Sequence, residues 1–262
     1  MGKTTTAVNL ASAIAIAERR TLLVDADPQA NSTRTLGFAD DPDRPTLYDL
    51  LLGQASLGDA RLAVESVPCL SLIPSTQDLI GAEVELVDAE GREFRLRRVL
   101  ESAVDGEEFV FIDCPPSLGF LTLNALTAAD GVLIPVQCEY LALEGISQMV
   151  ETIRRVRESL NPRLQIAGIL MTMFDERTNL ARQVVDEVRG VFGSDVFRTV
   201  IPRNIRLSEA PSHGKPIFLY DIRSKGAEAY FNLAKEFLDH EAKSTREGAT
   251  QPDSGSASVD PS

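Results

Sequence analysis

Six short apolar segments alternate with longer segments of helical character, and this alternation restricts the possible folds of the chain more than any other feature. The segments are rich in Val, Ile, Leu and Phe with few polar interruptions, which is typical of strands buried on both faces. They lie at residues 21–26, 70–74, 109–113, 131–136, 166–174 and 196–202. Repeated strand–helix alternation predicts an α/β fold, a doubly wound and mostly parallel sheet with helices on both faces.

Helical periodicity is clearest near the start of the chain. Ala7, Leu10, Ala11, Ile14 and Ala17 follow one another at steps of three and four residues, as the apolar positions on one face of a helix do. Further helices are predicted at residues 78–103, 119–128, 144–160, 179–192 and 226–241.

The composition excludes several classes of protein. Among 262 residues, 26 Lys and Arg stand against 39 Asp and Glu, a net charge of −13. This excludes a globally basic protein that coats nucleic acid, but not a local basic patch. No apolar run reaches about 18 residues, so no membrane-spanning helix is expected, and the first residues do not resemble a signal peptide. Three scattered cysteines, Cys69, Cys114 and Cys138, argue for a reducing compartment and against disulfides or a metal knuckle.

The chain divides at residue 242. Residues 1–242 carry the strand and helix patterns of one domain, whereas residues 243–262 are acidic and rich in Ser, Gly and Pro. Such a segment buries too little apolar surface to offset the entropy of ordering, so we expect a disordered tail. A partner-binding or regulatory segment is the alternative.

Residues 2–5 read Gly-Lys-Thr-Thr and stand directly before the first predicted helix. They match the second half of a Walker A loop, in which Lys3 lies beside the β- and γ-phosphates and the helix N-terminus adds N–H donors and a positive dipole. Thr4 would then ligate Mg²⁺ and Thr5 would reach the α-phosphate. Alone the tetrapeptide is a weak signal, because it also occurs at helix starts by chance.

Acidic residues at two strand ends strengthen the prediction of a phosphate site. Asp25 and Asp27 lie at the carboxyl end of segment 21–26, and Asp113 ends segment 109–113. Open α/β sheets bind ligands at this edge, and an Asp that ends an apolar strand is the Walker B element that helps to hold Mg²⁺. The alternatives are a cap for the next helix in the case of Asp25 and Asp27, and a turn residue in the case of Asp113.

These segments belong to longer motifs: GKTTTAVNLASAIA, LLVDADPQAN, FIDCPPSLGFLTLNAL, PVQCEYLALEGISQM, GILMTMFDERTNLARQVVDEV, VFRTVIPRNIRLSEAPSHGKPIFLYD and GAEAYFNLAKE. Through them the chain resembles the ParA/Soj family of deviant-Walker P-loop ATPases, which partition chromosomes and plasmids or position cargo. The resemblance spans residues 2 to about 238, and DCPPSLGFLTLNAL and IPRNIRLSEAPSHGKPI are its most specific parts. It implies a ParA-like P-loop ATPase domain over residues 1–242.

The resemblance also implies a role for each residue of the phosphate site. Gly2, Lys3, Thr4 and Thr5 would contact ATP, with Lys3 serving catalysis as well as binding. Asp27 resembles the carboxylate that positions the hydrolytic water.

The same resemblance implies which residues would lie at the magnesium ion and at the adenine. Thr4, Asp25 and Asp113 would make up the protein part of the Mg²⁺ site. Pro202 and Asn204 resemble the adenine-side contacts. Met173, with Phe174, would lie near them, and core packing explains these two side chains equally well.

The sequence departs from the family pattern at its first residue. The family has a strand followed by KGGxGKT, and this sequence begins at the x with Met1. It therefore lacks the first strand and the two glycines that let backbone N–H groups wrap the phosphates. It also lacks the signature lysine that reaches across the family's nucleotide-sandwich dimer. Loss of a strand near the sheet centre leaves two neighbours with unpaired backbone groups. Because every later motif is intact, we expect a mis-assigned start or a fragment. The alternative is a true short protein that binds nucleotide poorly and serves as an interaction module.

A local excess of positive charge lies at residues 189–225, where seven basic side chains accompany three acidic ones, a net of +4. It predicts nonspecific DNA binding through phosphate contacts, with Arg203, Arg206, Arg223 and Lys225 as the candidates. A solvated surface of mixed charge is the alternative.

The function that we expect on this resemblance is a cytoplasmic, nucleoid-associated partition switch. ATP closes a homodimer, the dimer binds DNA nonspecifically, and a ParB-like partner stimulates slow hydrolysis. No membrane partner is expected, because the C-terminal residues do not form a basic amphipathic helix. The alternatives are a catalytically impaired DNA- or protein-binding module and a ParA-like cargo-positioning ATPase.

Overall fold

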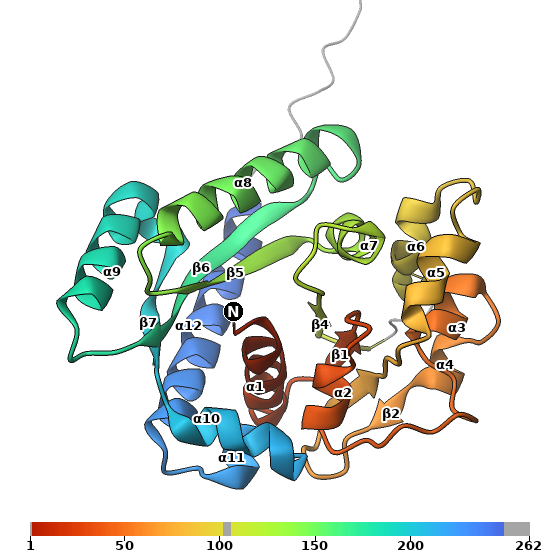
Figure 1. The fold of residues 1–262 in the computed structure, drawn as a ribbon, viewed down its shortest axis with the longest axis horizontal. Coiled ribbons are helices and arrows are strands. Elements are labelled where there is room, and N and C mark those ends of the chain that lie inside the picture. The colour runs from red at the N-terminus through yellow and green to blue at the C-terminus, as the bar shows by residue number, and fades with distance from the viewer. Residues whose placement is uncertain (1, 102–105, 249–262) are drawn as a thin grey trace, which may run out of the picture.

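Two β-sheets with helices packed around them make up the computed structural model, which describes residues 2–101 and 106–248 (Figure 1). The first sheet has the order β2-β3-β1-β4 and the second β5-β6-β7. The strands are β1 Thr21–Asp25, β2 Leu62–Ala63, β3 Leu70–Ile73, β4 Phe109–Asp113, β5 Gly131–Gln137, β6 Gln165–Phe174 and β7 Val196–Pro202. All strand pairs are parallel except β2–β3, so the mostly parallel α/β fold is confirmed.

The helices vary widely in length. In chain order they are α1 Lys3–Ile16, α2 Asn31–Thr35, α3 Leu47–Leu52, α4 Leu57–Ala60, α5 Leu79–Glu85, η1 Arg92–Phe94, α6 Arg95–Glu101, α7 Phe120–Ala128, α8 Ala142–Ser159, α9 Asn179–Phe192, η2 Gly193–Asp195, α10 Ile205–Glu209, η3 Ala210–His213, α11 Ile217–Tyr220 and α12 Lys225–Gly248.

The six strands predicted from apolar segments are all present, with ends that shift by about one residue. The single helix predicted at 78–103 is wrong. The chain there forms α5, a turn, η1 and α6, and Gly91 stands at the break with φ 60°, in the left-handed region that glycine adopts readily. Residues 102 and 103 of that prediction lie outside the described residues.

The two sheets share no ladder of hydrogen bonds. β4 ends the first sheet and β5 ends the second, and no described strand lies between them. Residues 109–112 of β4 are half-buried, whereas every residue of β1 is buried, because β1 has a strand on each side and β4 on one only.

Helix α1 lies between the two sheets and is buried on two faces. Val8 and Ala11 pack with the first sheet, and Leu10 and Ile14 pack with the second sheet and α12. The sequence predicts a single apolar face, and Ala17, placed on it, is exposed at the end of the helix. A helix that is apolar on most sides is one that the fold encloses.

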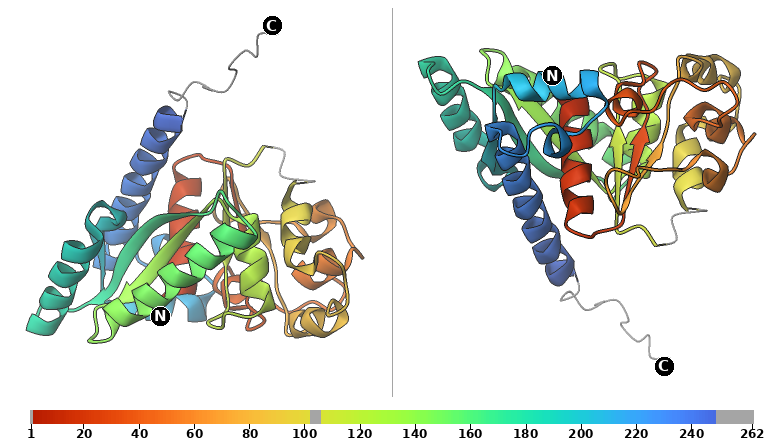
Figure 2. Two further views of the ribbon diagram at one scale, coloured as in Figure 1. Left: turned by 90° about the horizontal axis from the view of Figure 1, so that it is seen from above. Right: turned by 90° about the horizontal axis from the view of Figure 1, so that it is seen from below.

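The last helix, α12, packs beside α1 and continues beyond the body of the fold (Figure 2). Tyr230 is buried, with its hydroxyl 3.2 Å from Thr6 Oγ1. Glu236 accepts hydrogen bonds from the backbone N–H groups of Arg198 and Thr199 on β7. The helix runs past residue 242 to Gly248, and the rest of the predicted tail, residues 249–262, lies outside the described residues. None of the described helices has the length and apolar character needed to cross a membrane.

We predict that Ile14→Ala lowers the free energy of unfolding by about 2–5 kcal/mol, because Ile14 is fully buried between the sheets and its loss leaves a cavity. Ile16→Ala is the matched control on the same helix, since Ile16 is 40% exposed, and its effect should stay below about 1 kcal/mol. Urea titrations followed by circular dichroism measure both changes. Equal effects would contradict the enclosed position of α1.

Candidate functional site

The N-terminus of α1 lies where the carboxyl ends of strands from both sheets meet. Lys3 Nζ donates a hydrogen bond of 3.1 Å to the Pro115 carbonyl, just beyond β4. Gly2 caps the helix with φ 109°, and a Cβ added to it would lie 3.5 Å from Thr172 Oγ1 on β6. A Cβ would be in ordinary van der Waals contact there, so it is the left-handed conformation that favours glycine over other residues.

Asp25 ends β1 and is completely buried. Its Oδ2 accepts hydrogen bonds from the backbone N–H and the hydroxyl of Thr33, at 2.8 and 2.7 Å, and its Oδ1 accepts one from the N–H of Asp27 at 3.2 Å. Burial raises the pKa of Asp25 to about 7, and the negative charge of Asp113 adds to this effect.

Asp113 lies directly across from Asp25 in the β1–β4 register. Its Oδ2 accepts a 2.8 Å hydrogen bond from Ser32, and the Thr4 hydroxyl lies close enough to the carboxylate to influence its pKa. Burial raises the pKa of Asp113, whereas these two hydroxyls and the Lys3 ammonium act to lower it. Oδ1 of Asp113 is buried and has no hydrogen-bond partner among the described residues.

Asp27 lies in the turn between β1 and α2 and is buried. Its Oδ1 accepts a hydrogen bond of 2.9 Å from the N–H of Gln29. Its charge acts on the Asp113 carboxylate. The structure therefore brings together five of the residues predicted for the phosphate and metal side, namely Lys3, Thr4, Asp25, Asp27 and Asp113.

The chemistry of this cluster suits a magnesium ion. Two buried carboxylates and a hydroxyl lie together, and the unpartnered Oδ1 of Asp113 is an oxygen without a donor. Within the described part of the chain no group of three or more His, Cys, Asp or Glu side chains is arranged to chelate a metal by itself. Mg²⁺ fits such a site, because it takes one or two carboxylates and completes its shell with water and phosphate oxygens.

The residues predicted for the adenine side meet at the carboxyl edge of the second sheet. Phe174, at the end of β6, pairs with Pro202, at the end of β7. Met173 is 44% exposed, with φ 54°, so core packing does not account for its side chain. Asn204 accepts a hydrogen bond from the N–H of Arg206 and caps α10.

Asn9 connects the phosphate side to the segment after β7, a role that the sequence does not reveal. It is buried, its Nδ2 donates to the Thr5 carbonyl, and its Oδ1 accepts from the N–H of Ile217, each at 2.8 Å. Thr5 itself lies in the first turn of α1, as predicted.

Ser32 and Thr33 are two further site residues that the sequence reading missed. Both lie on α2, immediately after the DADPQA turn, and each hydroxyl bonds one of the buried carboxylates. Small hydroxyl residues shortly after an acidic strand end are the sequence pattern that could have predicted these two contacts.

The four candidate DNA contacts lie near one another, but acidic side chains are interspersed among them. Arg206 is 2.8 Å from Glu209 and 3.5 Å from Asp221, and Asp221 also accepts from the N–H of Arg223. Lys225 is 3.7 Å from Glu176. The neighbouring Asp175 has a pKa that the positive charge of Arg203 helps to lower. Arg203 and Arg223 form no ion pair with another described residue.

The chain is similar in sequence and in structure to several known proteins. A family model described as an AAA domain matches residues 1–166. The chain is 56% identical to the chromosome partitioning protein ParA of Myxococcus xanthus, over 91% of this chain and 84% of that protein. It is 54% identical to the sporulation initiation inhibitor protein Soj of Bacillus subtilis, over 90% and 93%. Among solved structures, a cobyrinic acid a,c-diamide synthase from Mycobacterium smegmatis with bound ADP and magnesium superimposes with a TM-score of 0.80 at 37% identity, covering 93% of this chain and 91% of that one.

We predict that Thr33→Val lowers the free energy of unfolding by about 1–3 kcal/mol. The hydroxyl both donates to Asp25 and accepts from the N–H of Ser75 at 3.1 Å, so its loss leaves buried groups without partners while the side-chain shape is kept. Thr152→Val on α8, whose hydroxyl donates only to the Gln148 carbonyl of its own helix, is the control and should change stability by less than about 0.5 kcal/mol. Urea titration compares the two, and an equal response would show that the Thr33 hydroxyl does not support Asp25.

Proposed function

The chain belongs to the ParA/Soj family of chromosome partitioning ATPases, and we propose that it works as an ATP-dependent partition switch. ATP with Mg²⁺ is the nucleotide, hydrolysis is slow, and the ATP-bound form dimerises, binds DNA and responds to a ParB-like partner. The observation that supports this most directly is the meeting of Lys3, Thr4, Asp25 and Asp113 at the N-terminus of α1.

In this proposal the residues at the start of α1 bind the phosphates. The Lys3 ammonium, Gly2 and the free N–H groups of the first helical turn, Thr4 and Thr5 among them, attract the β- and γ-phosphates. Thr4, Asp25 and Asp113 would hold Mg²⁺, which supplies positive charge to the phosphate oxygens when bound. Met173, Pro202 and Asn204 would border the adenine, since they lie at the neighbouring edge of the second sheet.

Catalysis in this proposal is positioning and electrostatics. Asp27 orients the attacking water with its carboxylate, and Lys3 offsets the negative charge that builds up on the phosphate oxygens. The turn that carries Asp27 is braced by its own hydrogen bond to Gln29 and by the bond from its N–H to Asp25.

Dimerisation through the same edge is supported by its exposed apolar side chains. Leu118 follows β4 and is 59% exposed, and Tyr140 and Leu141 follow β5 with exposures of 85% and 64%. Large apolar side chains gathered at one edge of a fold are typical of an interface, here between two copies of the chain that enclose nucleotide.

DNA binding in the proposed cycle uses Arg203, Arg206, Arg223 and Lys225. Exposed ion pairs hold their partners only weakly, so the pairs of Arg206 and Lys225 can be exchanged for phosphate contacts. Binding of this kind reads no bases and places the protein on the nucleoid.

We predict that Lys3→Ala and Asp27→Ala fail at different steps. Lys3→Ala should weaken binding of a fluorescent ATP analogue about ten- to hundredfold, as expected for a lost charge-assisted hydrogen bond. Asp27→Ala should keep that affinity within about threefold and lower the rate of phosphate release at least about 100-fold.

Asp43→Ala is the control for both variants, because Asp43 is exposed and distant in sequence from every site residue. Measurements with DNA and a ParB-like peptide present complete the test. Wild-type ATP binding in Lys3→Ala, or wild-type hydrolysis in Asp27→Ala, would overturn the proposed site.

We predict that Arg223→Glu weakens retention of DNA in the presence of ATP about equally for unrelated sequences. The slope of log affinity against log NaCl concentration should become shallower by about one, since one phosphate contact is lost. Arg206→Glu should act in the same direction. Arg182→Glu on α9, also exposed, is the control, and an equal loss in that variant would place the DNA contacts elsewhere.

A further inference from the structure

Helix α5 presents apolar side chains to solvent as well as to the core. Leu79, Ala82 and Leu86 are buried against α3, in a core cluster that also contains Leu96 of α6. On another side Ile80, Val84 and Val87 are exposed by 55%, 72% and 55%. These three residues recur at steps of four and three, so they form one stripe along the helix and the turn that follows it.

The stripe lies in an acidic stretch of the chain that ends before Arg95, Arg97 and Arg98. Residues 78–93 contain six acidic side chains and one basic one, Arg92. None of the six forms an ion pair with another described residue. The six are Asp78, Glu83, Glu85, Asp88, Glu90 and Glu93. An apolar surface with uncompensated negative charge is complementary to a basic apolar ligand.

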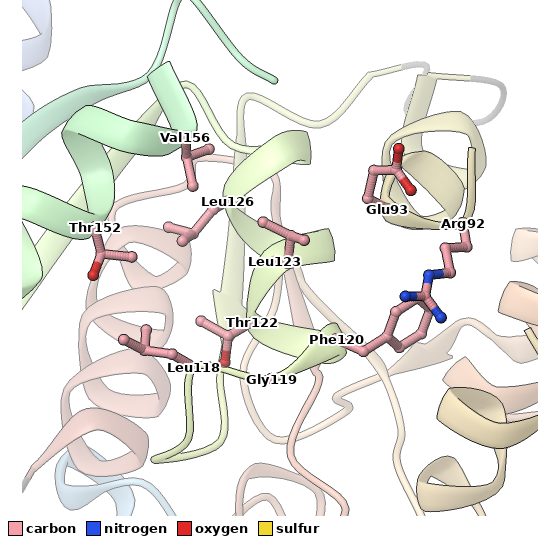
Figure 3. A pocket seen from close by; sticks show the side chains of 10 residues that line it. All are labelled: Arg92, Glu93, Leu118, Gly119, Phe120, Thr122, Leu123, Leu126, Thr152 and Val156. Atoms are coloured by element: carbon pink, nitrogen blue, oxygen red, sulfur yellow. The ribbon is translucent and has the colours of Figure 1, made fainter. Parts of the chain in front are cut away.

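A cavity of about 350 Å³ lies next to the stripe, between η1, α7 and α8. Its lining is mostly apolar, and Figure 3 shows Leu126 beside Val156 on one side and Phe120 beside Arg92 on the other. A cavity of this size accepts one or two large side chains of a partner.

Two hydrogen bonds join the cavity to the stripe. Glu83 Oε1 accepts a bond of 3.1 Å from the N–H of Phe120, and Arg92 Nη1 donates one of 3.0 Å to the Val87 carbonyl. The stripe and the cavity are therefore parts of one surface, which we call the α5 surface and define by Ile80, Val84, Val87 and Phe120.

We propose that the α5 surface binds a basic amphipathic helix of a partner protein. Its apolar residues, spaced by three and four, would lie along Ile80, Val84 and Val87 and enter the cavity beside Phe120, and its Lys and Arg residues would face the acidic side chains. The proposal concerns a surface apart from the nucleotide site, so it does not depend on the proposed function.

Other occupants fit this surface less well. DNA and anionic lipid headgroups carry phosphate charges that six unpaired acidic side chains repel. A second copy of the chain carries a net charge of −13, so two copies repel each other overall.

The test uses a defined probe, a fluorescein-labelled peptide of Leu and Lys about 18 residues long that forms an amphipathic helix of about five turns. A scrambled peptide of the same composition and a Leu/Glu version of the helix are the peptide controls. Fluorescence anisotropy measures the affinity for the wild-type chain, Val84→Asp and the double variant Asp88→Lys/Glu90→Lys.

Matched protein controls come from α9. Val191 is 65% exposed, and Asp186 and Glu187 are exposed acidic residues on the same helix. Val191→Asp and Asp186→Lys/Glu187→Lys thus reproduce each change on a surface without the cavity. Circular dichroism checks that every variant is folded.

We expect the Leu/Lys helix to bind the wild-type chain at least about tenfold more tightly than either control peptide, and each α5 variant to lose at least about tenfold, or about 1.4 kcal/mol. The α9 variants should stay within about twofold of wild type. Hydrogen exchange should show that the peptide protects amides in residues 79–87 and 118–123.

Three outcomes would overturn the proposal. One is equal loss in the α5 and α9 variants, which would mean nonspecific attraction to an acidic protein. Another is amide protection confined to other parts of the chain. The third is self-association of the wild-type chain, seen by sedimentation without peptide and abolished by Val84→Asp, which would make a second copy the occupant.

Discussion

The burial of α1 on two faces is the constraint on which the rest of the structure depends. β4 and β5 are not hydrogen-bonded to each other, so side-chain packing, and not a β-ladder, holds the two sheets together. Leu10 and Ile14 join α1 to the second sheet, and Val8 and Ala11 join it to the first. Because the axis of α1 is fixed in this way, its N-terminus is fixed where the carboxyl ends of the strands meet, and this position creates the site.

The buried carboxylates of Asp25 and Asp113 destabilise each other's ionised forms. Asp25 and Asp113 lie opposite each other in buried positions, where desolvation and mutual repulsion disfavour the ionised forms. Hydroxyl groups of Ser32 and Thr33 hold the two carboxylates in position without neutralising them. A site arranged in this way favours the arrival of positive charge beyond that of Lys3, which already lowers the pKa of Asp113.

The local part of this arrangement was predictable from sequence, and the long-range part was not. Apolar segments that end in Asp25 and Asp113 indicate both a buried strand and the edge at which it ends, so strands and carboxylates could be placed together. The bond between Asn9 and Ile217 joins residues 208 positions apart and leaves no periodic pattern in either segment. The break at Gly91 was missed because apolar spacing continues across it, and short helices such as α2 hold too few residues for a period to appear.

The bond from Lys3 to the Pro115 carbonyl has a consequence for the loop after β4. Pro115 and Pro116 have no N–H groups, so this stretch can be held through its backbone only by its carbonyl oxygens. A phosphate at the helix N-terminus competes with Pro115 for the same ammonium. Thermodynamic linkage is reciprocal, so a ligand that binds the loop only in its present position weakens phosphate binding by the same factor by which phosphate weakens the binding of that ligand. The same Lys3 ammonium can thus bind either the nucleotide phosphates or the loop carbonyl.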